Sequence, residues 1–468
     1  MLVSTDVEIL DPRYSTDVVS LRATRLIHAG LSRLDSETLE PIPYAAESWS
    51  WESPRSLRVK LRTDLLFHSG KPFDADDVVA TFDAFASPEV ASRHAGVVEP
   101  LLRVIKNDTH DVTFILKRDH ATLLTDLEVP ILRRDQAFSA PAPNGSLDGL
   151  GPYRLLRRTA GAVVLEPSDT RILPKARHSV VLRTVHDENA RALRMFSGRA
   201  DVSEDQLSPA LLPALNREAS LVVRKAHAAS LTYLAVNWHH PALSNVHARA
   251  AIARSVDRMR FTTHVFSETA VPALSALPLL FADPPGEPLR FDSTFALSER
   301  AEAEREGVRW NVPIELLVSP DRFRVTLGRL LVSDWQRVGI AAELQPMEFG
   351  SLVQRLTRGD FALALMQLPE LSEPNLLRHF LHSDFVPPKG ANRGRVHDTN
   401  LDRWLDDGAS TLNRDERRAI YTRINEHIVQ TLPIIPLWHE EHVAVLSKRA
   451  KELPLSADGR WLGLAMLP

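Results

Sequence analysis

The sequence predicts a mixed α/β protein with more than one domain. Segments of alternating apolar and polar residues, typical of strands, are interspersed along the whole chain with segments of helical periodicity. No repeat period relates these segments to one another. The chain has 468 residues, which favours about three units at roughly 150 residues per domain.

The first 120 residues contain two clear strands and one well-marked helix. Ser56–Arg62 and Asp111–Lys117 alternate strictly and are bounded by turn residues, so each predicts a strand. Phe73–Phe82 predicts a helix, with Asp74 as its N-cap and Asp77 at its third position.

A loop divides this part of the chain from the next strands. The stretch 138–151 holds two Pro, three Gly and one Asn, a composition typical of a connection between units. The elements expected after it are strands at 161–166 and 179–184, a helix at 188–196, a strand at 231–237, a loop at 238–241 and a helix at 246–259.

A second α/β block begins near Pro313. Gly339 suits the stop between a long amphipathic helix and the next strand. The prolines of Leu432–Leu437 suit an edge strand or a crossover between domains. The other elements expected here are strands at 314–318, 341–346 and 361–366 and helices at 323–338, 401–409 and 414–430.

Composition excludes several classes of function. The net charge of −4 gives no basic footprint, so no nucleic-acid partner is expected. The absence of Cys excludes disulfides, thiol nucleophiles and Cys-ligated metal sites. Arg outnumbers Lys by 47 to nine, which we attribute to genomic base composition and not to function.

No catalytic constellation is visible, so the chain is predicted not to be an enzyme and to need no cofactor. Gly-x-Ser-x-Gly, P-loop and dinucleotide fingerprints are all missing. His439-Glu440-Glu441-His442 lacks the four-residue spacing of a metalloprotease helix, so we interpret it as a turn into a strand. His239-His240 is interpreted as a solvated pair in a loop, and no metal site is predicted.

The start of the sequence has neither a basic nor an apolar leader region. Met1-Leu2-Val3-Ser4 runs directly into polar sequence. Either the protein is cytosolic, or it is exported and its signal segment is absent from this sequence.

Several segments, in the expected order, resemble the peptide- and nickel-type solute-binding proteins of ABC importers, the extracellular solute-binding protein family 5. The most specific is Phe67–Val78, which reads FHSGKPFDADDV against the family pattern FHdGkpftAeDV. The others are Leu10–Pro12, Leu26–Leu31, Pro43–Trp49, Gly149–Tyr153, Gly198–Val202 and Arg249–Arg258.

The resemblance implies a two-lobed, type II periplasmic-binding-protein-like α/β fold with an additional domain. Extended hinge crossovers would join the lobes, which close around a ligand. By analogy, domain I takes residues 1–34, 150–240 and 439–468, domain II takes 35–149, and domain III takes 241–438.

The resemblance also places ligand residues. Peptide binders of this family hold the ligand ammonium with an Asp in a W-x-x-D-Y segment, and Gln367–Pro374 is the matching stretch here, without the Trp and the Tyr. Anchoring on Glu373-Pro374 puts Glu370 at the Asp position, whereas anchoring on Gly359–Phe361 puts Leu371 there; Glu370 could equally be a solvated loop acid. The ligand-binding residues expected are Thr16, Asp17 and Val18 from domain I, Trp238 at the hinge, and Glu370 and Glu373.

The function that follows is that of an extracytoplasmic solute receptor, periplasmic or membrane-anchored. It is expected to be a monomer that binds a peptide or other amine-bearing small solute and delivers it to ABC permease transmembrane subunits. The alternatives are a cytosolic ligand-sensing regulator or enzyme that reuses the fold, and, within the receptor class, a binder of oligosaccharides or metal chelates.

Overall fold

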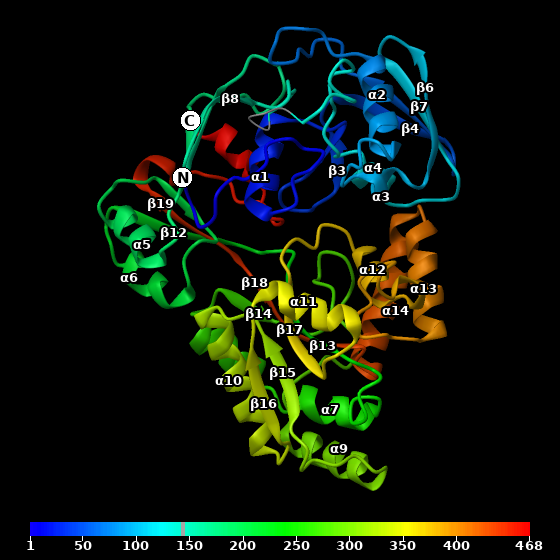
Figure 1. Cartoon of the computed structure of the whole chain (residues 1–468), viewed down its shortest axis with the longest axis vertical. Coiled ribbons are helices and arrows are strands. Elements are labelled where there is room, and N and C mark those ends of the chain that lie inside the picture. Colours follow the sequence, from blue (N-terminus) through cyan, green and yellow to red (C-terminus); the bar gives the residue numbers. More distant parts are fainter. Residues whose placement is uncertain (142–145) are drawn as a thin grey trace. The chain divides into compact units, whose positions relative to one another are not determined.

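The computed structural model describes residues 1–141 and 146–468 and divides the chain into two compact units (Figure 1). Unit 1 comprises Met1–Ala226 and His442–Pro468, and unit 2 comprises His227–Glu441. The chain therefore passes from one unit to the other twice. The three-domain division expected from the sequence stays a prediction.

A seven-stranded sheet forms one half of unit 1. Its strands lie in the order β12 (Leu221–Ala226), β19 (His442–Ser447), β11 (Val202–Glu204), β1 (Leu2–Val3), β10 (Val180–Thr184), β9 (Ala162–Pro167) and β8 (Tyr153–Thr159). β1 runs parallel to both of its neighbours. The termini of the chain thus both contribute to unit 1, since β1 lies in the middle of this sheet and β19 begins the C-terminal segment.

Helices cover both faces of this sheet because its strands alternate. Val3 and Leu446 face the core that includes α1 (Val18–Ile27) and the 3-10 segment Trp461–Met466. Leu2 and Val445 face the opposite core, with α5 (Glu188–Phe196) and α6 (Leu212–Asn216). The predicted helix at 188–196 and the strands at 161–166 and 179–184 are confirmed.

A second sheet in unit 1 confirms the predictions for the first 120 residues. Its order is β4 (Ala46–Ser53), β5 (Ser56–Leu61), β7 (Asp111–Leu116) and β6 (Leu101–Asp108). Helix α2 (Ala75–Ala86) packs on it, and Phe82 and Phe114 meet edge-to-face at 5.0 Å between ring centroids. Smaller elements of this region are β2 (Ser32–Leu34), β3 (Pro41–Pro43), α3 (Ala95–Val98) and α4 (Leu123–Asp126).

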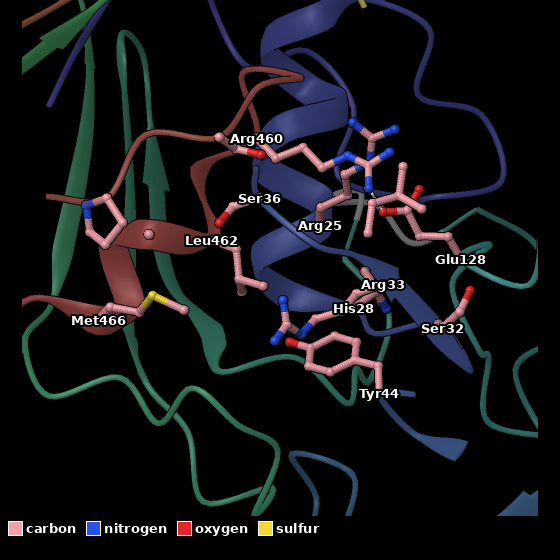
Figure 2. Close-up of a pocket in the computed structure, with 15 residues that line it drawn as sticks. Arg25, His28, Ser32, Arg33, Ser36, Tyr44, Glu128, Arg460, Leu462 and Met466 are labelled. Atoms are coloured by element: carbon pink, nitrogen blue, oxygen red, sulfur yellow. Dashed lines mark ion pairs between the residues drawn. The ribbon is translucent and has the colours of Figure 1, made fainter. Parts of the chain in front are cut away.

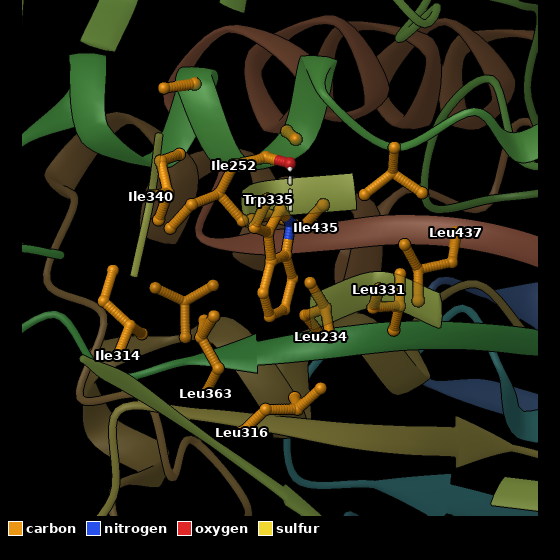
Figure 3. Close-up of a cluster of buried hydrophobic side chains, with 14 of the residues drawn as sticks. Leu234, Ile252, Ile314, Leu316, Leu331, Trp335, Ile340, Leu363, Ile435 and Leu437 are labelled. Atoms are coloured by element: carbon orange, nitrogen blue, oxygen red, sulfur yellow. Dashed lines mark hydrogen bonds between the residues drawn. The ribbon is translucent and has the colours of Figure 1, made fainter. Parts of the chain in front are cut away.

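Unit 2 is built on a six-stranded mixed sheet. Its order is β14 (Ala270–Pro272), β18 (Ile434–Glu440), β13 (Leu231–Val236), β17 (Leu363–Leu368), β15 (Ile314–Val318) and β16 (Ala342–Pro346). Fully buried Trp335 lies in its main core, where the indole N–H donates to the Ile252 carbonyl at 3.2 Å (Figure 3). The helices are α7 (Val246–Arg254), α8 (Arg258–Arg260), α9 (Ser293–Arg305), α10 (Arg322–Arg337), α11 (Phe349–Arg358), α12 (Leu376–Leu381), α13 (Thr399–Ser410) and α14 (Arg414–Thr431).

One expectation for unit 2 is wrong in its bounds, and one of the two alternatives for the strand near 432–437 is excluded. The helix expected over 246–259 ends at Arg254, because the Asp257 side chain accepts from the Arg260 N–H and caps α8 instead. β18 is not an edge strand, since β14 and β13 flank it. Pro436 has no N–H to donate, and its strand tolerates it where the register with β13 shifts, between Thr232 and Tyr233. Immediately after β18, the chain crosses to unit 1.

Among the described residues, no helix is both long and apolar enough to cross a membrane.

Candidate functional site

Polar side chains gather at the carboxyl ends of the parallel strands in unit 1. Glu204 ends β11, and Asp205 and Gln206 follow it, so these side chains emerge at one edge of the sheet. In open α/β sheets that edge is the usual place for a ligand, because loops and helix termini converge there.

A buried ionic network occupies this edge. The Asp205 carboxylate accepts from the His442 Nδ1 at 2.6 Å and lies 3.5 Å from the Arg22 guanidinium, which α1 supplies. Burial alone would lower the pKa of His442, but the Asp205 carboxylate outweighs it and raises that pKa. Burial and the neighbouring Asp205 raise the pKa of Glu204 to about 8, so its carboxyl is protonated at neutral pH.

The C-terminal segment closes over the same network. Gly459 has a φ of +71° and lies so near Arg22 and His442 that a Cβ would stand 2.1 Å from the Arg22 Nη2. The positive φ favours glycine here, and any larger residue would also have to displace the Arg22 or His442 side chain. The next residue, Arg460, forms ion pairs with Asp458 and Glu128, and all three side chains are mostly buried. Burial, Arg25 and Arg22 together lower the pKa of Arg460.

A cavity of about 70 Å³ lies beside this segment, wholly within unit 1 (Figure 2). Its lining includes the side chains of Arg25, Arg33 and Arg460, with Glu128 as its carboxylate. The remaining lining residues are His28, Gly30, Ser32, Leu34, Ser36, Tyr44, Pro454, Ser456, Leu462, Gly463 and Met466.

Unit 2 carries a polar cluster at the carboxyl end of β17. The Arg324 guanidinium, from the first turn of α10, pairs with Glu440 at 3.1 Å and donates to the Gln367 Oε1 at 2.6 Å. Thr232 of β13 donates to the same Glu440 carboxylate at 2.6 Å. This arrangement presents an anchored guanidinium and an amide at the sheet edge, next to the segment that contains Glu370.

The domain I residues expected from the sequence lie at the start of α1. The Asp17 carboxylate caps the helix by accepting from the Ser20 N–H at 2.8 Å, and it is half-buried. Thr16 and Val18 are exposed beside it. Asp17 is therefore the N-cap of α1, a position that favours Asp. Its contact with a ligand stays a prediction.

Trp238 and Glu370 are not brought together. β13 and β17 are antiparallel, with Leu231 opposite Leu368 and Val236 opposite Leu363. Trp238 follows the end of β13 and Glu370 follows the end of β17, so the two residues lie at opposite ends of this strand pair. The crossing at His227 is at the Glu370 end, and Trp238 instead packs under the Arg249 guanidinium, 4.4 Å from its ring centroid.

The two acids of the 367–374 segment differ in their surroundings. Glu373 forms an ion pair with Arg417 of α14, and its carboxylate also accepts from the Asn375 N–H at 3.2 Å. Leu371, the alternative match to the family's Asp, is buried, and its N–H donates to the Ala229 carbonyl at 2.6 Å. Glu370 is half-buried, and its role as an anchor for an ammonium group stays a prediction.

The arginines of the buried ionic networks and of the cavity were not predicted from the sequence. Arg22 and Arg25 lie three residues apart in α1, a spacing that puts both on one helix face. That spacing was a usable signal, but the general excess of Arg hid it. Arg33, Arg324 and Arg460 carry no local sequence signal, because only tertiary packing assembles their surroundings.

No group of metal-ligating side chains is present in the described part of the chain. His439 contacts the Ser230 carbonyl at 2.5 Å, whereas His442 contacts Asp205, so the two imidazoles of the 439–442 motif serve different partners. His439 and His442 lie in successive strands separated only by Glu441, in place of the turn that we expected before a single strand.

Comparison with known proteins finds one family throughout. A sequence model described as bacterial extracellular solute-binding proteins, family 5 middle, matches residues 40–383. The di/tripeptide-binding protein 2 of Pseudomonas aeruginosa is 25% identical over 470 aligned residues, which cover 92% of this chain and 87% of that protein.

Solved structures share the fold over almost the whole chain. The ABC transporter substrate-binding protein CtaP of Listeria monocytogenes has a TM-score of 0.88 at 22% identity and covers 99% of this chain and 97% of its own. NikA of Brucella suis, solved with Fe(III)-EDTA, has a TM-score of 0.87 at 21% identity, with coverages of 100% and 98%. The predicted periplasmic-binding-protein-like α/β fold is thereby confirmed.

Proposed function

Because this chain belongs to the bacterial extracellular solute-binding proteins of family 5, we propose that it is the extracytoplasmic receptor of an ABC importer. Its ligand is a peptide or another amine-bearing small solute, which it delivers to the permease transmembrane subunits. It acts as a monomer, without catalysis and without a nucleic-acid partner.

The family match over residues 40–383 is the observation that carries this proposal. The matching relatives are receptors and not enzymes, and one is named a di/tripeptide-binding protein. The alignment with this relative covers 92% of the chain and 87% of the relative, so the proposal concerns the whole protein and not a single domain.

The ligand class rests on chemistry available in each unit. Half-buried Glu370, just after the end of β17, carries a carboxylate of the kind that holds an ammonium group. Arginine side chains in unit 1 and Arg324 in unit 2 suit the opposite end of a zwitterion. A peptide carries both of these charges, whereas a neutral oligosaccharide carries neither.

Native mass spectrometry of the purified protein tests the proposal, because a ligand that dissociates slowly remains bound through purification. We expect an added mass that denaturation releases as a peptide or amine. Calorimetric titration of the emptied protein with a dipeptide mixture should then show saturable binding. A released sugar or metal chelate would contradict the ligand class, and chemical turnover of the bound molecule would contradict the receptor itself.

A further inference from the structure

The unit 1 cavity contains buried hydrogen-bonding groups that have no protein partner. The Tyr44 hydroxyl and both ring nitrogens of His28 are buried and make no hydrogen bond within the described part of the protein. Tyr44 is 7% exposed and His28 is 3% exposed, and both line the cavity (Figure 2). Buried polar groups without partners are rare in folded proteins and call for an occupant.

Both groups offer a proton to that occupant. Burial raises the pKa of Tyr44, so its hydroxyl remains protonated and can donate. Burial lowers the pKa of His28 to about 3, and the positive charges of His68 and Arg13 act in the same direction. The ring is therefore neutral and has one N–H to donate.

The charge around the cavity favours an anion. Arg25, Arg33 and Arg460 all line it, and Glu128, which pairs with Arg460, is the only carboxylate among its lining residues. The other acid held by Arg460, Asp458, is fully buried and lies outside the lining. A cation would meet three guanidinium groups here, and an apolar group would leave the buried donors unpaired.

We propose that this cavity is a binding site for one compact oxyanion, with Tyr44, His28 and Arg33 as its donors. The volume of about 70 Å³ accepts a carboxylate or a small tetrahedral oxyanion and excludes a whole peptide. The oxyanion is either the carboxylate of the transported solute, in which case the inference rests on the proposed function, or a free inorganic anion that the protein retains.

Thermal unfolding at low millimolar sodium acetate, sodium sulfate and sodium chloride, matched in ionic strength, tests the site, because the general stabilisation of proteins by excluded sulfate requires much higher concentrations. Acetate and sulfate should raise the unfolding midpoint above that in chloride, because they bind only the folded protein. Equal midpoints in all three salts would overturn the proposal.

Two variants connect that effect to the cavity. Arg33→Gln and Tyr44→Phe should each weaken acetate or sulfate binding roughly tenfold to a hundredfold, as expected for losing one hydrogen bond to a charged group. Arg55→Gln is the charge-matched control, since Arg55 pairs with Asp119 on the surface. Anion stabilisation that persists in both cavity variants would place the anion elsewhere and overturn the proposal.

The anion-free variants supply a second measurement. Tyr44→Phe removes an unpaired hydroxyl, so its midpoint without anion should equal or exceed that of the parent protein. Tyr153→Phe is the matched control, because the Tyr153 hydroxyl donates to the Leu464 carbonyl at 2.9 Å and its loss should lower the midpoint. A Tyr44→Phe variant destabilised as much as Tyr153→Phe would contradict an unpartnered hydroxyl at this site.

Dialanine and dialanine amide distinguish the two sources of the oxyanion. If the solute supplies the carboxylate, amidation and Tyr44→Phe should each weaken dialanine binding roughly tenfold or more. Equal binding of both peptides, with acetate and sulfate still stabilising, supports the site and assigns it to a free anion. If neither peptide binds but the anions do, the site stands and the peptide ligand class fails.

Discussion

Adjacent acids at the end of β11 show how strongly position decides the behaviour of a side chain. Asp205 keeps its charge, because His442 and Arg22 lower its pKa against the effect of burial. Glu204, its immediate neighbour, holds its proton because burial and the Asp205 charge raise its pKa. One residue is thus a counterion and the other a neutral group in the same network.

The Glu204 carboxyl makes the stability of unit 1 depend on pH. Its folded-state pKa of about 8 lies above its ordinary value of 4.5, so its stabilising contribution is complete below that ordinary value and is lost as the pH rises through about 8. The raised pKa of His442 acts in the same direction. The free energy of unfolding should therefore fall between about pH 4.5 and about pH 8, at about 1.4 kcal/mol per unit of pKa shift.

Glu204→Gln should remove most of this slope and stabilise the protein at the alkaline end, because the amide never ionises. Urea unfolding of the parent and the variant at both pH values measures the effect. A variant whose slope matches that of the parent would show that Glu204 ionises freely in the folded protein.

The two acids near the end of β17 should affect different properties when they lose their charge. Glu370→Gln, if Glu370 holds a ligand ammonium, should cost about 2–5 kcal/mol of binding free energy. Glu373→Gln should instead destabilise the fold by about 1–3 kcal/mol, since it leaves half-buried Arg417 without its carboxylate. Calorimetric titration with the co-purified ligand and thermal unfolding separate the two, and unchanged affinity in Glu370→Gln would remove our candidate anchor.

Single residues were the hardest feature to predict from sequence. The capping acid Asp74 was predicted from local spacing, because it serves the helix that begins beside it. Asp17 caps α1 in the same way, although we expected it only among the ligand-binding residues. Arg460 could not be found in this way, since its partner Glu128 lies more than 300 positions away in the chain. Buried charge networks are assembled by tertiary structure, so their members have no periodic signature.

At the scale of single elements, hydrophobic periodicity and the capping and turn residues at element ends predicted most helices and strands. α5 and α14 match their expected bounds to within one residue because capping residues mark where they begin. The helix expected over 246–259 is shorter than predicted, because the Asp257 side chain caps a separate short helix. Hydrophobic periodicity does not reveal a side chain that forms hydrogen bonds with backbone N–H groups in this way. The prolines of β18 left an edge strand and a crossover as alternatives, and the edge is excluded because β14 and β13 flank the strand. The register shift beside Tyr233 is a property of two strands together, so the sequence of one strand cannot reveal it.

The start of α2 allows the free energy contributed by one capping residue to be measured directly. The Asp74 side chain accepts from the Asp76 N–H at 2.9 Å, while the Asp77 carboxylate accepts from the Asp74 N–H at 3.1 Å. Asp74→Ala should cost about 1–2 kcal/mol of unfolding free energy, because it removes an N-cap. Asp76→Ala, the control on the same turn, removes only exposed ion pairs and should cost about 1 kcal/mol or less. Equal losses in urea unfolding would mean that the cap contributes nothing beyond its charge.

At the scale of the molecule, the resemblance predicted what periodicity could not. Alternating patterns indicate strands but not their order, and the order β12-β19-β11-β1 joins residues from both ends of the chain. The family's characteristic segments occur here in the family's order. They implied the fold, because members of one family share the same strand order. The dividing positions His227 and His442 lie beside continuous strands, where composition gives no boundary signal.

Unit 1 is completed only by residues that the chain reaches after it has formed unit 2. Arg460 is central to that completion, because its ion pairs with Asp458 and Glu128 fasten the C-terminal segment beside α1. Arg460→Gln would leave two acids buried with their cation gone, a loss that typically costs about 3–5 kcal/mol. Arg449→Gln in the same segment breaks a mostly exposed pair with Asp201 and should cost about 1 kcal/mol or less. Hydrogen exchange locates the effect: in Arg460→Gln, amides of 454–466 and α1 should lose protection, while those of β15 and β17 keep it. Protection lost equally in both units would mean that the C-terminal segment stabilises the chain as a whole and not unit 1 in particular.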